Sequence, residues 1–160
     1  MKNIAAIFAL LAASGTAFSQ DLATCSAPAG YAYFPLRGLL TAKDAGWETD
    51  KISAGVFTLR KVGDSDYDIL YVDATKRVYS TKSDGGAVRL LRSGENEMAF
   101  ISFYPGSTIE IYTFLRDNAG ANQVGILTSK GGDGLVQYKQ SAMIAACSGI
   151  TFVSPAIKAN

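Results

Sequence analysis

The sequence predicts one all-β domain, an antiparallel meander-type sandwich or small barrel of about 8 to 10 short strands with one disulfide bond. Three observations predict this class. Apolar and polar residues alternate in several segments, turn-forming residues separate those segments about every 8 to 12 positions, and two cysteines lie near opposite ends of the mature chain. No linker or low-complexity stretch divides the chain, so we expect residues 20–160 to form a single β domain.

Residues 1–19 have the pattern of a signal peptide. A basic residue precedes an apolar run at 4–13, which has the length of a signal core and is too short to span a membrane. Small residues favour cleavage between Ser19 and Gln20, with cleavage after Ala17 as the alternative. We therefore expect a periplasmic or secreted protein, and no later apolar stretch reaches the length of a membrane span.

The two cysteines are Cys25, just behind the signal, and Cys147, near the far end. An even number of cysteines in an exported chain indicates a disulfide bond. The bond would close a loop of about 120 residues and, in the chain-entropy description, stabilise the domain by roughly 5 kcal/mol. We therefore predict a Cys25–Cys147 bridge rather than two free thiols.

The first half of the mature chain contains one clear hairpin. In residues 56–62, apolar Phe57 and Leu59 alternate with polar neighbours, as in a half-buried strand. Turn-forming residues 63–66 separate this segment from 67–72, which is rich in strand-forming residues. Shorter strands are predicted at 31–34, 78–81 and 87–91, and residues 41–48 have a helical pattern.

The second half contains another hairpin. Residues 98–104 lead to Pro105 and Gly106, and 108–115 return from them. Proline fixes the first central position of a type II turn, and glycine accepts the positive φ that the second position requires. Shorter strands are predicted at 123–129, 135–138 and 150–153, whereas residues 140–146 fit a helix and a final strand equally well.

Composition excludes several kinds of chemistry. The chain has no histidine, so it lacks the usual general base, the usual zinc ligand and every Ser-His or Cys-His nucleophile pair. Its 15 Lys and Arg residues nearly balance 14 Asp and Glu residues and form no basic cluster, which argues against nucleic acid as a partner. We therefore expect no metal and no cofactor, and a binding protein more than an enzyme.

Two motifs resemble ligand loops without completing them. Asp64, Asp66 and Asp68 have the spacing of a calcium loop, but the glycine and the final glutamate of that loop are missing. Lys82 and Lys130 lie in glycine-rich bends that do not have the spacing of a phosphate-binding loop. Both motifs are therefore interpreted as turns.

Asp68, Glu110, Tyr112 and Trp47 are the candidates for ligand binding. Each carboxylate lies inside a predicted strand and shares a face with apolar neighbours, where it would be able to anchor a ligand or act as a general acid. The simpler expectation is that both lie on the outer face and pair with an Arg or Lys across the sheet. The two aromatic residues either stack on a ligand or pack in the core.

These observations favour a secreted or periplasmic, non-catalytic binding or interaction module, such as an inhibitor or an accessory protein of the cell envelope. Its partner would be a protein, a glycan or a small apolar ligand. One alternative is a small barrel that binds an apolar ligand. The other is a hydrolase that acts on envelope polysaccharide with a carboxylate pair such as Asp68 and Glu110.

Overall fold

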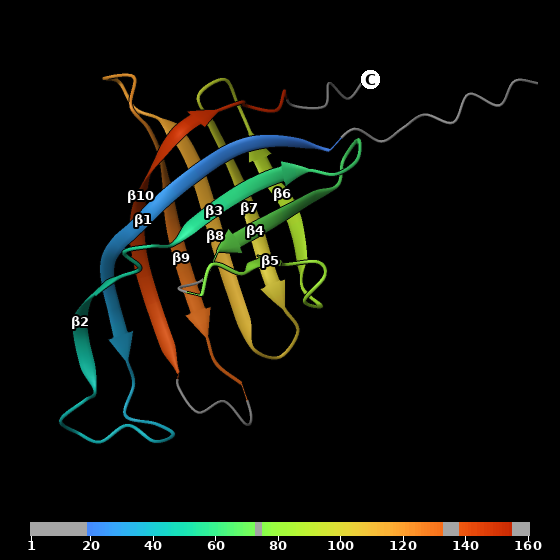
Figure 1. Ribbon diagram of the computed structural model, residues 1–160. Helices are drawn as coiled ribbons and strands as arrows, with labels where there is room; N and C mark the ends of the chain where they lie inside the picture. Colours follow the sequence, from blue (N-terminus) through green and yellow to red (C-terminus); the bar gives the residue numbers. More distant parts are fainter. Residues whose placement is uncertain (1–18, 73–74, 133–137, 155–160) are drawn as a thin grey trace, which may run out of the picture.

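Ten antiparallel strands form one sheet that curls into a half-barrel (Figure 1). This computed structural model describes residues 19–72, 75–132 and 138–154, and none of them is helical. It therefore contains no helix of the length and apolarity that a membrane span needs among the described residues. The strands are β1 (Gln20–Phe34), β2 (Gly46–Lys51), β3 (Val56–Lys61), β4 (Tyr67–Val72), β5 (Val78–Ser80), β6 (Ala87–Ser93), β7 (Glu97–Tyr104), β8 (Thr108–Arg116), β9 (Asn122–Lys130) and β10 (Lys139–Ile150).

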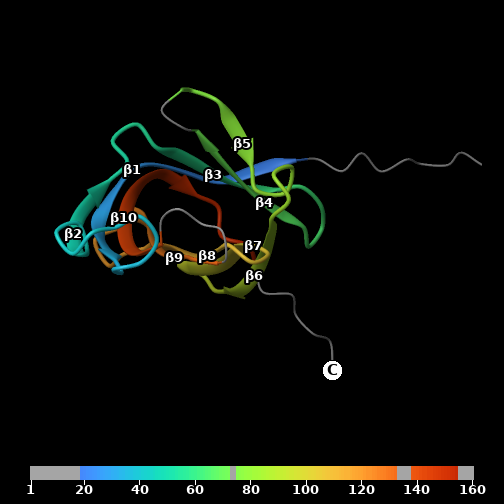
Figure 2. The ribbon, with the colours of Figure 1, turned by 90° about the horizontal axis from the view of Figure 1, so that it is seen from below.

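The first and last strands are neighbours in the middle of the sheet. The order is β5-β4-β3-β1-β10-β9-β8-β7-β6, and β2 pairs with the second half of β1. Figure 2 shows the curl: β3 and β4 lie across from β7 and β8, while β1, β2 and β10 form the side that connects them. The all-β antiparallel fold is thus confirmed. The prediction left a sandwich and a small barrel open, and the strands form one sheet curled into a half-barrel.

A bulge in β1 lets this strand pair with two partners in turn. Residues 20–26 pair with β3, and residues 29–34 pair with β2. Between them, Ala27 has a φ of 52° and Pro28 has no N–H to donate to a neighbouring strand. The backbone groups at the bulge form hydrogen bonds with the nearby loop. Ala27 N–H donates to Gly55 O at 2.8 Å, and Ile52 N–H donates to Pro28 O at 2.9 Å.

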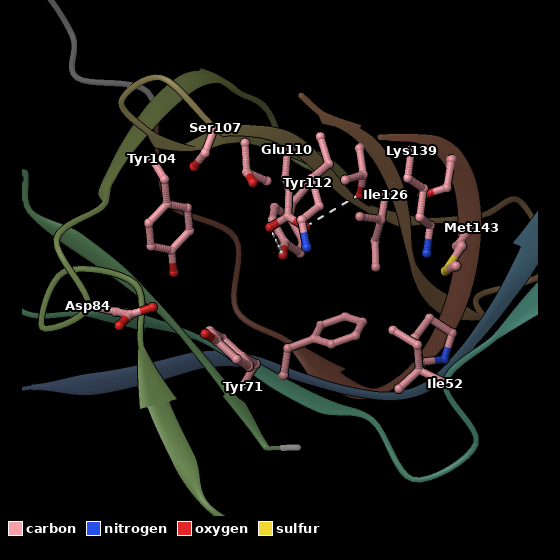
Figure 3. A pocket seen from close by; sticks show the side chains of 16 residues that line it. Ile52, Tyr71, Asp84, Tyr104, Ser107, Glu110, Tyr112, Ile126, Lys139 and Met143 are labelled. Atoms are coloured by element: carbon pink, nitrogen blue, oxygen red, sulfur yellow. Dashed lines mark hydrogen bonds between the residues drawn. The ribbon is translucent and has the colours of Figure 1, made fainter. Parts of the chain in front are cut away.

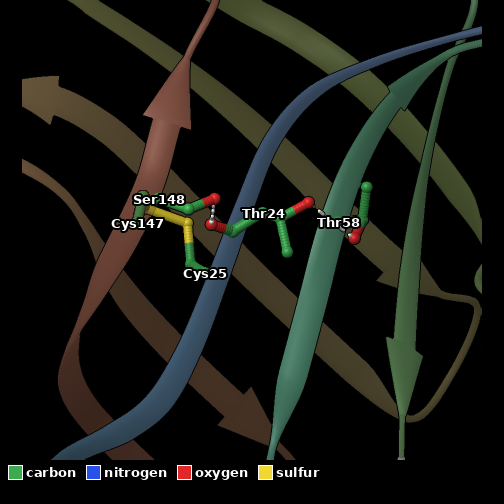
Figure 4. The surroundings of a disulfide bond; sticks show 5 residues. All are labelled: Thr24, Cys25, Thr58, Cys147 and Ser148. Carbon is green, nitrogen blue, oxygen red and sulfur yellow. Dashed lines mark hydrogen bonds between the residues drawn. A yellow bond between two sulfur atoms is a disulfide. The ribbon is translucent and has the colours of Figure 1, made fainter.

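The predicted disulfide bond is present at the centre of the sheet (Figure 4). Cys25 of β1 lies directly opposite Cys147 of β10, with their Cα atoms 3.9 Å apart. Beside it, Ser148 Oγ donates to Thr24 O at 3.3 Å, and the hydroxyl groups of Thr24 and Thr58 are 3.1 Å apart. The bridge therefore joins the two ends of the chain at the seam between β1 and β10.

The apolar core lies inside the curl. Tyr67 of β4 meets Phe100 of β7 edge to face across the interior, with ring centroids 4.9 Å apart. Phe57 of β3 and Tyr112 of β8 meet in the same way at 6.0 Å. The core residues come from both walls, and they are Leu22, Ala23, Cys25, Phe57, Leu59, Tyr67, Ile69, Val88, Met98, Phe100, Tyr112, Phe114, Val124, Ile126, Met143, Ala145 and Ile150.

Both predicted hairpins are confirmed, since β3 pairs with β4 and β7 pairs with β8. Gly106 has a φ of 76°, and the N–H of Ser107 donates to Tyr104 O at 3.1 Å, as a type II turn requires.

Other expectations need correction. The helical pattern at 41–48 is wrong, because this segment consists of turns and the start of β2. Residues 140–146 belong to strand β10, and that strand ends at Ile150, so the strand predicted at 150–153 does not form. Most of the strand predicted at 135–138 lies outside the described residues, as does almost all of the predicted signal peptide.

Candidate functional site

The inner face of the half-barrel carries a pocket of about 580 Å³ (Figure 3). This volume lies in the range that holds a small organic molecule. The pocket is bounded by both walls of the curl, and its lining residues are Pro28, Ile52, Phe57, Tyr71, Asp84, Tyr104, Ser107, Thr108, Glu110, Tyr112, Ile126, Thr128, Lys130, Lys139, Ser141 and Met143.

The register of β8, β9 and β10 arranges one wall of the pocket as three rows of inward side chains. Because side chains alternate between the two faces of a sheet, every second residue of each strand enters a row. The rows, from the inside toward the strand ends, are Tyr112–Ile126–Met143, Glu110–Thr128–Ser141 and Thr108–Lys130–Lys139. Polarity therefore increases along this wall. The innermost row is largely apolar, the middle row has one carboxylate and two hydroxyl groups, and the outermost row has two lysines at the mouth.

Glu110 is the carboxylate of the middle row. Tyr112 Oη donates a hydrogen bond of 2.7 Å to Glu110 Oε2, and Thr128 Oγ1 donates a longer one of 3.4 Å to Oε1. Burial, followed by the negative charge of Glu110, raises the pKa of Tyr112 well above its usual value. The phenol therefore keeps its proton and holds the carboxylate in place within the pocket.

The opposite end of the pocket carries two further tyrosines, Tyr71 of β4 and Tyr104 of β7, whose hydroxyl ends point toward each other in Figure 3. Burial and then the neighbouring Tyr104 raise the pKa of Tyr71. Tyr104 Oη is buried and forms no hydrogen bond of ordinary distance and angle with another described residue. A buried hydroxyl without a partner is costly, so this atom is suited to a hydrogen bond with a bound molecule.

A tight turn holds Asp84 at the edge of the pocket, and Asp68 anchors that turn. Ser80 Oγ donates to Asp68 Oδ2 at 2.6 Å, and the backbone N–H of Lys82 donates to Asp68 Oδ1 at 3.1 Å. The Lys82 ammonium also forms an ion pair with Asp66. Asp66 and Asp68, two of the three carboxylates with calcium-loop spacing, thus fix the turn.

Asp68 itself does not line the pocket. It lies on the face of β4 that points away from the core, and it is buried under the 80–86 turn. The expectation of an outer-face position is therefore right for Asp68, which lies directly opposite Arg60 of β3 and, after Asp21, helps to raise the pKa of that guanidinium. The hydrogen bonds that Asp68 accepts come from a hydroxyl and a backbone amide. For Glu110 the same expectation is wrong, because Glu110 lines the inner pocket with Tyr112.

Trp47 lies on the outer face of the sheet. Its side chain is 70% exposed on β2 and packs at an angle against Tyr33, with ring centroids 5.4 Å apart. Together with apolar residues of β8, β9 and β10 it borders a shallow surface depression. Of the four predicted ligand-binding residues, the fold thus brings together only Glu110 and Tyr112.

Sequence reasoning missed Asp84, Thr128 and Ser141 as pocket residues. Their inclusion depends on the register of neighbouring strands and on the 80–86 turn, for which a single sequence gives no direct signal. Comparison of the chain with protein-family models, with curated proteins and with solved structures finds no significant match.

Proposed function

We propose that this protein binds a small, largely apolar molecule inside the half-barrel. The observation that carries the proposal is the convergence of four aromatic rings, those of Phe57, Tyr71, Tyr104 and Tyr112, on a cavity of about 580 Å³. Small-molecule sites are concave and mostly apolar, with a few placed polar groups that orient the ligand. Here Glu110 and the unpartnered Tyr104 hydroxyl supply those groups.

A carboxylate-dependent hydrolase is a weaker interpretation of the same geometry. Such an enzyme needs two carboxyl groups on opposite sides of the bond that it cleaves. Of the pair expected for this role, Glu110 lines the pocket, whereas Asp68 lies on the other face of β4 and is engaged with the turn. This arrangement supports binding over hydrolysis by that pair.

We also propose that the protein works in the periplasm or outside the cell. The Cys25–Cys147 bond fits an oxidising compartment, where disulfide bonds form and persist. The predicted signal peptide at 1–19 leads to the same location. Reduced cysteines in protein isolated from its native source would contradict this assignment.

The binding proposal is tested with N-phenyl-1-naphthylamine, a neutral apolar dye whose fluorescence rises in an apolar site. We expect saturable binding by the wild-type protein and loss of binding in Ile126→Trp, because this buried inward side chain lines the cavity. Leu127→Trp is the matched control, since Leu127 is the next residue of β9 and points outward.

A second blocking variant guards against a folding defect in the first. Ser107→Trp places the indole at the β7–β8 turn, where Ser107 borders the same cavity without belonging to the core. Circular dichroism confirms the fold of each variant. Absence of dye binding by the wild-type protein, or equal binding by all variants, would refute the proposal.

The outer face favours a second candidate function, self-association. The outward-facing positions of β8, β9 and β10 carry no charged side chain. On each of these strands one of the outward residues, Ile109, Leu127 or Ile144, is at least half exposed. Apolar surface that is depleted of charge is typical of the centre of homodimer interfaces. We propose a second copy of this chain as the partner of this face.

Sedimentation velocity over a range of concentrations tests self-association. We expect Leu127→Lys to shift the equilibrium toward monomer, because the ammonium group would have to be buried between two apolar faces. Val78→Lys is the control, since Val78 is similarly exposed but lies on β5, away from this face. A wild-type monomer at every concentration would contradict the proposal.

A further inference from the structure

The pocket contains a carboxylate without a cationic partner. Glu110 is partly buried, and its oxygens accept hydrogen bonds only from the hydroxyl groups of Tyr112 and Thr128 among the described residues. None of the ion pairs in the described chain includes it. An ionised carboxylate can accept about four hydrogen bonds, so Glu110 retains acceptor sites for a bound group.

The other charges around the pocket do not replace that missing partner. Lys139 lines the same cavity, but its ammonium group forms an ion pair with Asp50 of β2. Lys130 lies in the outermost row, at the end of β9, and is exposed to solvent. Asp84 is likewise exposed, at the opposite edge. Glu110 is therefore the charged group inside the pocket that has no charged partner among the described residues.

Aromatic rings surround the same space. The ring of Tyr112 adjoins Glu110, and Phe57 meets Tyr112 edge to face across the pocket. Tyr71 and Tyr104 line the far end (Figure 3). The faces of aromatic rings attract cations, and this attraction is strongest where water is excluded. The rings and the carboxylate thus both attract a positive charge.

We propose that the ligand is a small organic cation, an amine or quaternary ammonium compound with an apolar portion. Its cationic group lies against Glu110, and its apolar portion lies on the Tyr112–Ile126–Met143 row. An organic anion of the same size would instead bring its charge against Glu110. This inference rests on the proposed function and adds the charge of the ligand to it.

Calorimetric titration with a pair of matched probes tests the charge. Benzyltrimethylammonium is the cation, and 3-phenylpropionate is an anion of similar size. We expect the cation to bind and the anion to bind at least about tenfold more weakly, because a buried like-charge contact is unfavourable. In Glu110→Gln, which keeps an acceptor for Tyr112, the affinity for the cation should fall about tenfold or more.

Two controls separate this inference from the proposed function. Glu97→Gln removes a carboxylate that pairs with Arg92 outside the pocket, and it should leave cation binding unchanged. Binding of the neutral dye N-phenyl-1-naphthylamine by the wild-type protein measures the proposed function separately, because the dye carries no charge. Dye binding without a preference for the cation, or unchanged cation affinity in Glu110→Gln, would overturn this inference alone. Failure of both dye and cation to bind would overturn the proposed function as well.

Discussion

Tyr112 donates a 2.7 Å hydrogen bond to Glu110, the residue two positions earlier on the same strand and the same inner face. Both side chains therefore reach the pocket from one strand, and no loop positions either of them. Because β8 pairs on both sides, with β7 and β9, the two side chains have little freedom to separate. A fixed carboxylate in a largely apolar cavity is the central feature of the candidate site.

Tyr112→Phe removes the hydroxyl group while keeping the ring. We expect the free energy of unfolding to fall by about 1 kcal/mol, because Glu110 loses its shortest hydrogen bond inside the pocket. Urea unfolding at pH 7 measures the change. Tyr31→Phe is the control, since Tyr31 is 60% exposed on the outer face and should change stability by less than about 0.5 kcal/mol. Equal stability of Tyr112→Phe and wild type would show that the bond contributes nothing.

Stability is expected to fall in alkaline solution. Burial raises the pKa of Tyr67, Tyr71 and Tyr112 above the usual value, with additional effects of Tyr104 on Tyr71 and of Glu110 on Tyr112. The unfolded chain releases these protons near pH 10 while the folded chain retains them, so the stabilisation is complete below about pH 10 and decreases as the pH rises further.

Urea midpoints measured between pH 8 and pH 11.5 test this expectation. The decline above about pH 10 should be shallower in Tyr112→Phe than in the wild type, because one of the three phenols is gone. A wild-type midpoint that stays constant through this range would contradict the raised pKa values.

Loss of the disulfide bond should destabilise the protein strongly. The bond spans 122 residues, and the chain-entropy description gives a contribution of about 5 kcal/mol for a loop of this length. We expect the double variant Cys25→Ala, Cys147→Ala to show a much lower urea midpoint than the oxidised wild type. Wild-type protein with a reducing agent serves as the comparison, and a midpoint unaffected by both treatments would contradict this estimate.

Asp68→Ala should loosen the turn that carries Asp84. The substitution leaves Ser80 Oγ and the Lys82 amide without their acceptor, and we expect a loss of about 1 to 3 kcal/mol. Hydrogen exchange at the Lys82 amide should accelerate at the same time. Asp64→Ala, in the exposed β3–β4 turn, is the control and should change neither measurement. Unaltered exchange at Lys82 would show that the turn does not depend on Asp68.

The fold could be predicted where side-chain alternation is strong. Phe57 and Leu59 indicate the inward face of β3, because apolar residues recur there at every second position and polar residues lie between them. In β8, apolar residues occur on both faces, so alternation alone does not tell which face is inward. For the long strand β1, the sequence pattern predicts only the final residues, 31–34. Pro28 and the left-handed Ala27 interrupt its pattern at the bulge where the strand changes partner. Strand β2 is an exposed edge with Trp47, Glu48 and Asp50, so burial leaves little pattern in it.

The site was predictable only in part, because alternation along a strand is a local pattern and contacts across the cavity are not. Alternation placed Glu110 and Tyr112 on one face of one strand, and that local statement needs no knowledge of topology. The identity of the residues across the cavity depends on how the sheet curls. Tyr71 meets Tyr104 only because β4 comes to lie across from β7, and this pairing of distant segments leaves no local signal in either strand.

The central position of β1 has a consequence for how the chain matures. Its partner β10 is the last of the described strands to be synthesised, so the edge of β1 that faces β10 stays unpaired until then. Contacts between such distant segments form slowly, since a long loop must close first. Until β10 is made, the facing edges of β1 and β9 remain unpaired in the nascent molecule and are open to aggregation. A truncation that ends before Lys139 should consequently aggregate instead of forming a smaller stable domain.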